Sequence, residues 1–232
     1  MSTGTGAAVL ERTEIRGVYK YCDDWCEYCQ LTRQCASHRV RREWKARQGS
    51  DGPTDRKGMI AFTRAVAAAE GERTPGLDAL IAGDPAGEYQ PAPADEELVR
   101  LANQYAVGAA FLLQRTGWVP PASGTLGRPP SPKDVLAWYH MFLAARASRA
   151  LVAAARADRG IPGEREDAEG SGKIALISIE RSRSALMRLA GGSHGRICRH
   201  LIRMLETLAA GLDARVPGAR AFVRVGLDAP VV

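Results

Sequence analysis

Long hydrophobic runs, histidines and aromatic residues are all scarce in this 232-residue sequence. No apolar stretch approaches the roughly 18 to 20 residues that a membrane-spanning helix needs, so we expect no association with membranes. The N-terminal stretch MSTGTGAAVLERTEIRG lacks the basic start and the apolar core of a secretion signal. Together these absences predict a cytoplasmic protein.

Motifs of several enzyme classes are missing as well. None of the four histidines has a glutamate three residues before it, which excludes the motif of di-iron carboxylate bundles. The segment GSGK at 170–173 is not a phosphate-binding loop, because Asp167 replaces its first glycine and Ile174 replaces the hydroxyl residue that reaches magnesium. No nucleophile, acid–base pair or cofactor motif therefore argues for an enzyme.

Basic residues outnumber acidic ones, and the formal net charge is +6. One basic set runs from Arg39 to Arg47, directly after a cysteine-rich stretch. A second set lies on two expected helices and consists of Arg181, Arg183, Arg188, Arg196, Arg199 and Arg203. Such sets neutralise phosphates, which makes nucleic acid a candidate partner of the Arg39–Arg47 region. A solvated basic surface explains the same residues.

The second half of the chain has a strongly helical pattern. Apolar residues recur at helical spacing over residues 93–116, 131–157, 171–190 and 193–216. Pro132 suits the first position of the second of these helices. The expected N-caps of the four helices are Asp95, Ser131, Ser171 and Ser193. The pattern predicts an all-α fold, an antiparallel helical bundle of about four main helices.

The chain is expected to have three parts. Residues 1–50 form a cysteine-rich metal-binding segment, in which RREWKARQ extends as a basic helix. Residues 51–94 contain a short helix over 56–70 and a connector rich in glycine and proline. Residues 95–232 form the helical bundle with a short C-terminal tail, where RAFVRVGL is the only strand-like piece.

Four of the five cysteines lie close together in the N-terminal part. They are spaced C-x3-C-x2-C-x5-C, and they are Cys22, Cys26, Cys29 and Cys35. A reducing cytoplasm disfavours paired disulfides, so clustered thiols indicate metal binding or redox chemistry. The four cysteines are therefore the candidate ligands of a metal centre.

The spacing favours an iron-sulfur cluster over zinc. A structural zinc site usually takes two pairs of ligands from two separated turns, whereas one contiguous stretch supplies all four thiols here. A 4Fe-4S cluster is larger, and closely spaced cysteines on one segment can wrap around it. Zinc stays open as the alternative, and His38 is a candidate to replace one thiolate. The fifth cysteine, Cys198, lies among aliphatic residues and is expected to be a small buried hydrophobe.

The stretch CEYCQLTRQC resembles two iron-sulfur families. Its C-x2-C-x5-C spacing resembles the last three cluster ligands of WhiB-type redox-responsive regulators and is similar to that of AddB-type iron-sulfur nucleases. Both resemblances imply a 4Fe-4S cluster. In both families the first cysteine lies well upstream, whereas Cys22 stands four residues before Cys26. The turn that follows the cluster in WhiB proteins and the strand-borne nuclease residues are both missing from this sequence.

A wider resemblance covers most of the chain. The segments CDDWCEYC, WYHMFLAAR and EGSGKIALISIERS together look like an uncharacterised bacterial family of helical four-cysteine proteins. The resemblance implies a bacterial, helical protein with a four-cysteine centre, and it implies no particular activity.

These observations predict a redox protein that transfers single electrons or senses oxidants for a partner protein. Trp25 and Tyr28 are expected to shield the cluster, while Asp23, Asp24 and Glu27 are expected to lower its reduction potential. Two alternatives remain, a redox-responsive regulator that binds nucleic acid and a helical scaffold stabilised by zinc. In the helical part, His140 is expected to be a core residue rather than a haem ligand.

Overall fold

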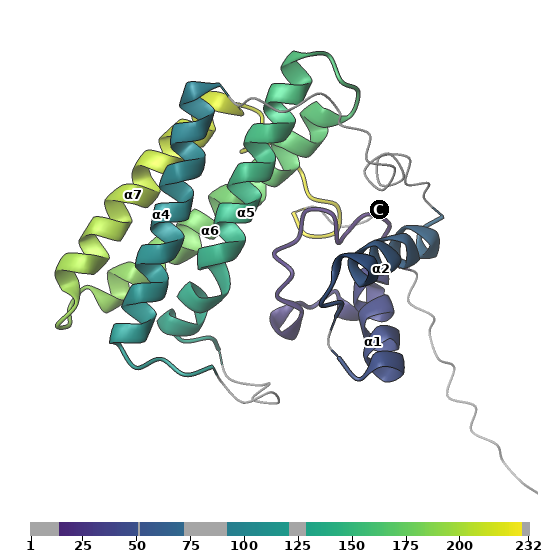
Figure 1. Ribbon diagram of the computed structural model, residues 1–232, viewed down its shortest axis with the longest axis horizontal. Helices are drawn as coiled ribbons and strands as arrows, with labels where there is room; N and C mark the ends of the chain where they lie inside the picture. The colour runs from purple at the N-terminus through teal and green to yellow at the C-terminus, as the bar shows by residue number, and fades with distance from the viewer. Residues whose placement is uncertain (1–13, 51, 72–91, 121–128, 229–232) are drawn as a thin grey trace, which may run out of the picture. The chain divides into compact units, whose positions relative to one another are not determined.

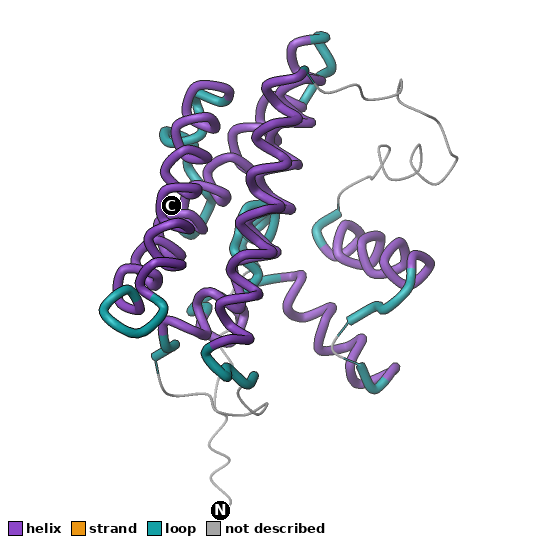
Figure 2. Tube along the Cα trace, turned by 60° about the vertical axis from the view of Figure 1, so that its left-hand side comes forward, coloured by secondary structure: helices purple, strands orange, loops and turns teal. Residues whose placement is uncertain are grey.

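The computed structural model describes residues 14–50, 52–71, 92–120 and 129–228 (Figure 1). Most of these residues are helical and none of them forms a strand, which confirms the all-α class (Figure 2). The expected connector between the two helical regions lies largely outside the described residues, and the strand-like tail at 220–227 forms turns and loop. The elements are η1 (Cys26–Tyr28), η2 (Thr32–Gln34), α1 (Ala36–Gln48), α2 (Arg56–Ala69), α4 (Pro93–Arg115), α5 (Pro132–Asp158), α6 (Glu164–Leu189) and α7 (Gly195–Arg215).

Contacts divide the chain into two compact units. Of the described residues, the first unit contains 14–20, 28–50, 52–71 and 225–228, and the second contains 21–27, 92–120 and 129–224. The boundary crosses the cysteine-rich segment, because residues 21–27 pack with the long helices and the residues after them pack with α1 and α2. Among the described residues, no helix is both long enough and apolar enough to cross a membrane.

The second unit is built from four long helices that share one apolar core. Helix α4 packs against α5 and α7, and α6 packs against the same two helices (Figure 1). Two glycines let α4 and α7 approach closely, since a Cβ atom at Gly108 would lie 2.7 Å from Leu201 and one at Gly211 would lie 2.3 Å from Leu98. Fully buried leucines fill the centre, among them Leu136, Leu143, Leu151, Leu186, Leu205, Leu208 and Leu212.

Of the four expected N-caps, only Ser131 is confirmed. Its hydroxyl accepts the amide of Asp134, whose carboxylate accepts the amide of Ser131 in return, so the pair forms a capping box. Asp95 is not the cap of α4, because the helix begins at Pro93 and places Asp95 in its first turn. There the buried carboxylate accepts hydrogen bonds from Arg215 Nε at 3.0 and 3.2 Å.

The expected caps Ser171 and Ser193 are wrong for an identifiable reason. The glycines beside Ser171 suggest a break, yet α6 begins at Glu164 and runs through them. Acidic residues in the first turn favour this earlier start, because they complement the positive end of the helix dipole. Ser171 is consequently buried inside the helix. Helix α7 begins at Gly195, so His194 rather than Ser193 takes the N-cap position.

The first unit packs α1 against α2 through an edge-to-face contact of Trp44 with Phe62. The expected helix at 56–70 is confirmed as α2, and the expected basic helix is longer than RREWKARQ, since α1 already begins at Ala36. The chain before the cysteines is tied to both ends of this pair of helices. The buried Glu70 carboxylate accepts the amide of Gly17 at 2.8 Å, and the Ile15 amide donates to the Gln34 carbonyl at 2.9 Å.

Candidate metal centre

Each of the two compact units carries two of the four clustered cysteines. Cys22 and Cys26 belong to the second unit, and Cys29 and Cys35 belong to the first. All four side chains are partly buried. None of the five cysteines, all of which lie within the described residues, forms a disulfide. Their sulfur atoms are therefore chemically suited to act as metal ligands.

Tyr21 anchors the start of the segment that carries the first two thiols. Its ring lies directly over Gly170 in the second turn of α6, where a Cβ atom would lie 2.4 Å from two ring carbons. The same ring makes an edge-to-face contact with Phe222 at a centroid distance of 4.9 Å. Gly170 therefore serves to admit the Tyr21 ring, which accounts for one glycine of the GSGK segment without any phosphate ligand. Gly172 has a comparable role, because a Cβ atom there would lie 2.9 Å from Ala219 Cβ.

Asp23 holds the segment to α5 and α6 through both its side chain and its backbone. The Tyr139 hydroxyl donates to the Asp23 carboxylate at 2.6 Å, and Arg181 of α6 forms an ion pair with the same carboxylate oxygen. Trp138 Nε1 donates to the Asp23 carbonyl at 2.9 Å. Burial, followed by the Asp23 carboxylate, raises the pKa of Tyr139 above its usual value, so the hydroxyl keeps the proton that it donates.

Trp25 covers the segment between Cys22 and Cys26 with an aromatic stack. Its ring is parallel to Trp138 at a centroid distance of 5.3 Å and meets Tyr139 edge-on at 5.7 Å. These contacts hold the half-buried Trp25 ring against α5, and its role as a shield for a cluster stays a prediction. Tyr28, the other expected shield, is 41% exposed.

Backbone amides point at two of the four sulfur atoms in the same way. The Asp24 amide lies 3.4 Å from Cys22 Sγ, and the Leu31 amide lies 3.4 Å from Cys29 Sγ. In both cases the donor follows the cysteine by two residues. The first of these turns requires a positive φ of 55° at Asp24, a conformation that aspartate tolerates better than most residues. Amides placed in this manner act as hydrogen-bond donors to a cysteine sulfur.

Cys35 occupies the N-cap position of α1. Its side chain makes no capping hydrogen bond. Burial is the main influence on its thiol and raises the pKa, with Cys29 and Glu70 adding to the increase. The amides of His38 and Ser37 act in the opposite direction, as expected at a helix N-terminus. A metal that binds Cys35 must therefore displace a firmly held proton.

Arg146 on α5 supplies a cation near Cys22. Its guanidinium lies over the Phe142 ring at 5.0 Å from the centroid, and the residue is half-buried. Burial lowers the pKa of Arg146, whereas the nearby Cys22 and Asp24 favour its charged form. No carboxylate of the described residues forms an ion pair with Arg146. Its charge is thus left to interact with the Cys22 region.

The other candidate residues have structural roles. His140 Nδ1 lies 2.9 Å from the Ala137 carbonyl, the local hydrogen bond expected of a core histidine. Cys198 is fully buried in the core of the second unit, as expected, and burial raises the pKa of its thiol. His38 lines a hollow of about 500 Å³ together with Cys35 and Arg42.

Across the described ranges, no three side chains of histidine, cysteine, aspartate or glutamate gather closely enough to hold a metal ion. The structure gives two thiols in each unit, and a centre formed by all four stays a prediction. Comparison with protein-family models finds no match, and comparisons with curated proteins and with solved structures find no significant match either. The function must therefore be inferred from the residues of this chain.

The sequence pattern did not identify the residues that hold the segment in place. Helical spacing places Trp138 and Tyr139 on the apolar face of the helix at 131–157, and Arg181 belongs to a basic set that a solvated surface explains. The available signal was the adjacency of Trp138 and Tyr139, because both side chains carry a polar group that needs a partner when it is buried. Their partner, Asp23, lies more than a hundred residues away in the chain.

Substituting Gly170 with alanine tests how the segment is anchored. Alanine favours a helix interior by roughly 0.5–1 kcal/mol over glycine. Because the new methyl group would overlap the Tyr21 ring, we expect Gly170→Ala to lower the free energy of unfolding by about 1–3 kcal/mol in urea denaturation. In a Tyr21→Ala background the same substitution is expected to be neutral or stabilising. A loss of equal size in both backgrounds would contradict the packing described here.

Proposed function

We propose that Cys22, Cys26, Cys29 and Cys35 bind a 4Fe-4S cluster and that the protein transfers single electrons or senses oxidants. Such a cluster, when bound, takes up or releases one electron at a time. The observation that carries the proposal is the repeated amide-to-sulfur contact at Cys22 and Cys29. Amide donors to sulfur are a principal means by which proteins tune iron-sulfur sites.

The donor set fits the proposed group chemically. Four thiols on one stretch match the preference of iron-sulfur clusters for cysteine ligands. The aromatic stack of Trp25 and Trp138 adds a low-dielectric wall beside the first two thiols. Zinc accepts the same four ligands, so a zinc-stabilised scaffold is the alternative within this site.

The charges around the first two thiols act in opposite directions. Arg146 favours the more negative, reduced state and raises the reduction potential, while Asp24 lowers it. The Asp23 carboxylate contributes less than its charge suggests, because Arg181 neutralises it. Glu27 lies on the short turn η1 next to Cys26. We therefore expect the potential to reflect a balance between the charge of Arg146 and that of Asp24.

The proposal also covers the arrangement of the long helices, the location of the protein and its partner. We propose that α4 to α7 form an antiparallel bundle that supports the segment, which their pairwise packing favours. A cytoplasmic location is consistent with cysteines that form no disulfide. The protein would then act on a redox partner protein, because a centre that carries single electrons needs a donor or an acceptor for them.

Metal content tests the proposal directly. The full chain, produced and purified without oxygen, is expected to be brown, to absorb at about 400 nm and to contain about four iron atoms. The variants Cys22→Ser and Cys35→Ser are expected to lose most of the iron. Cys198→Ser is the matched control and keeps it, because Cys198 is buried in the helical core. Colourless protein with stoichiometric zinc would contradict the cluster and support the zinc scaffold.

The midpoint potential tests the role of Arg146. Arg146→Gln is expected to lower the potential by on the order of 50 mV, because a cation close to Cys22 is removed. Arg146→Lys keeps the charge and should keep most of the potential. Arg149→Gln is the control, since Arg149 is already paired with Asp167 at 2.9 Å. Equal potentials in all four proteins, measured by redox titration, would show that Arg146 does not act on the centre.

A second candidate function is binding of nucleic acid regulated by the same centre. One observation favours it: Cys35 is the N-cap of α1, so the last thiol and the basic set from Arg39 to Arg47 belong to one element. Binding or loss of a metal at Cys35 would therefore act directly on the N-terminus of α1, the helix that carries the basic residues. Within this set Arg39 is already engaged by Glu14 and Glu43, which leaves its charge partly neutralised.

Salt dependence of DNA binding tests the second candidate. If α1 contacts phosphates, Arg42→Gln/Arg47→Gln should reduce the slope of log affinity against log salt by about two. Arg183→Gln/Arg188→Gln on α6 is the control and should leave the slope unchanged. The affinity should also differ between metal-loaded and metal-free protein. Absence of binding to DNA and RNA at low salt would exclude this function.

A further inference from the structure

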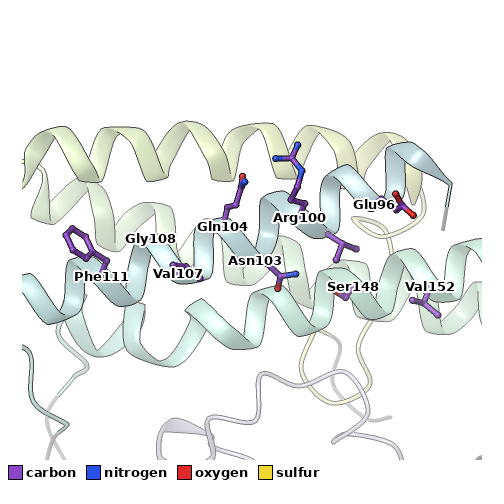
Figure 3. Close-up of a pocket in the computed structure, with 10 residues that line it drawn as sticks. Glu96, Arg100, Asn103, Gln104, Val107, Gly108, Phe111, Ser148 and Val152 are labelled. Carbon is purple, nitrogen blue, oxygen red and sulfur yellow. The ribbon is translucent and has the colours of Figure 1, made fainter. Parts of the chain in front are cut away.

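An exposed apolar groove runs along the outer face of α4, independent of the metal centre. It encloses about 950 Å³, and it is lined mainly by α4, with Ser148 and Val152 of α5 at one side (Figure 3). Two of its apolar side chains are conspicuously open to solvent, Val107 at 70% and Phe111 at 49% exposure. A lining of this kind is typical of a surface that another molecule covers.

The charges on this face are arranged with opposite signs at its two ends. Glu96 lies in the first turn of α4 and lines the groove, with Glu97 next to it. Arg115 lies in the last turn, and its guanidinium covers the Phe111 ring at 5.7 Å from the centroid. The face therefore carries Glu96 at the start of the helix and Arg115 at its end. Between them lie Arg100, which pairs with Glu97 at 3.5 Å, and the apolar Val107 and Phe111.

We propose that a second copy of this chain docks on this groove, with the two α4 helices antiparallel. A two-fold axis between positions 105 and 106 pairs Glu96 of each copy with Arg115 of the other. It also places position 100 of each copy opposite position 111 of the other, where Arg100 and Phe111 can form a cation–aromatic contact. Measured along the helix direction, the two Val107 positions are then offset by about 4.5 Å, so the two side chains can pack together.

The pattern of charge favours a second copy over a different partner. An isologous interface must be complementary to itself, and an antiparallel pair of helices meets this condition when opposite charges occupy the two ends. A parallel arrangement would place Glu96 against Glu96 and Arg115 against Arg115. Each chain carries a net charge of +6, so two copies repel unless the contact face itself is balanced in charge.

Two charge-reversed variants test the arrangement. Glu96→Arg/Glu97→Arg places basic residues at both ends of the face, and Arg115→Glu places acidic residues at both ends. Each variant alone is expected to dimerise at least about tenfold more weakly than the parent chain in analytical ultracentrifugation at low salt. Mixed in equal amounts, the two variants are expected to form a heterodimer, because both ends are then complementary.

A third variant tests the apolar centre of the face. Val107→Glu is expected to abolish dimerisation, because it places a charge of the same sign on both copies at the closest point. Met187→Glu on α6 is the matched control, since Met187 is 48% exposed outside the groove, and it should dimerise like the parent chain. Thermal unfolding of each variant separates loss of association from loss of fold. A parent chain that is monomeric at high concentration, or a mixture of the reversed variants that stays monomeric, would overturn the proposal.

Discussion

The Asp23 carboxylate is the point on which the candidate centre depends. It receives the Tyr139 hydroxyl from α5 and pairs with Arg181 from α6, while Trp138 binds the carbonyl of the same residue. One residue of an irregular segment is thereby fixed to two long helices that are themselves packed by a leucine and alanine core. A segment without its own core gains its order in this way, because the entropic cost of fixing it is offset by bonds to an already rigid surface.

That attachment determines where the first two thiols lie. Tyr21 precedes Cys22 and rests on Gly170, and Trp25 precedes Cys26 and stacks on Trp138. Cys22 and Cys26 therefore each follow directly after an aromatic residue that packs against one of the long helices. The amide of Asp24 is directed at Cys22 Sγ as a consequence of the turn between these two anchors. Arg146 follows Tyr139 and Phe142 on α5, and its charge lies near Cys22.

Periodicity predicted most of the helical structure and none of these anchors. The spacing of apolar residues is a local property, so α2, α4, α5, α6 and α7 follow from it. The N-cap of α5 follows as well, since Ser131 and Asp134 are neighbours in the chain. The start of α6 does not, because Gly170 and Gly172 suggest a break while their purpose is to admit Tyr21 and Ala219. The pairing of Asp23 with Tyr139 and Arg181 joins residues more than a hundred positions apart, which no short pattern can encode.

The cysteine spacing predicts that Cys22, Cys26, Cys29 and Cys35 hold the centre, and the physical question is whether their four sulfur atoms bind one group together. X-ray absorption at the iron edge of the full chain, prepared without oxygen, measures the ligand atoms and the nearest metal neighbours at once. A 4Fe-4S cluster on Cys22, Cys26, Cys29 and Cys35 predicts a first shell of sulfur alone and a second shell of iron. A single metal ion with no metal neighbour, or a first shell that contains nitrogen or oxygen, would contradict it.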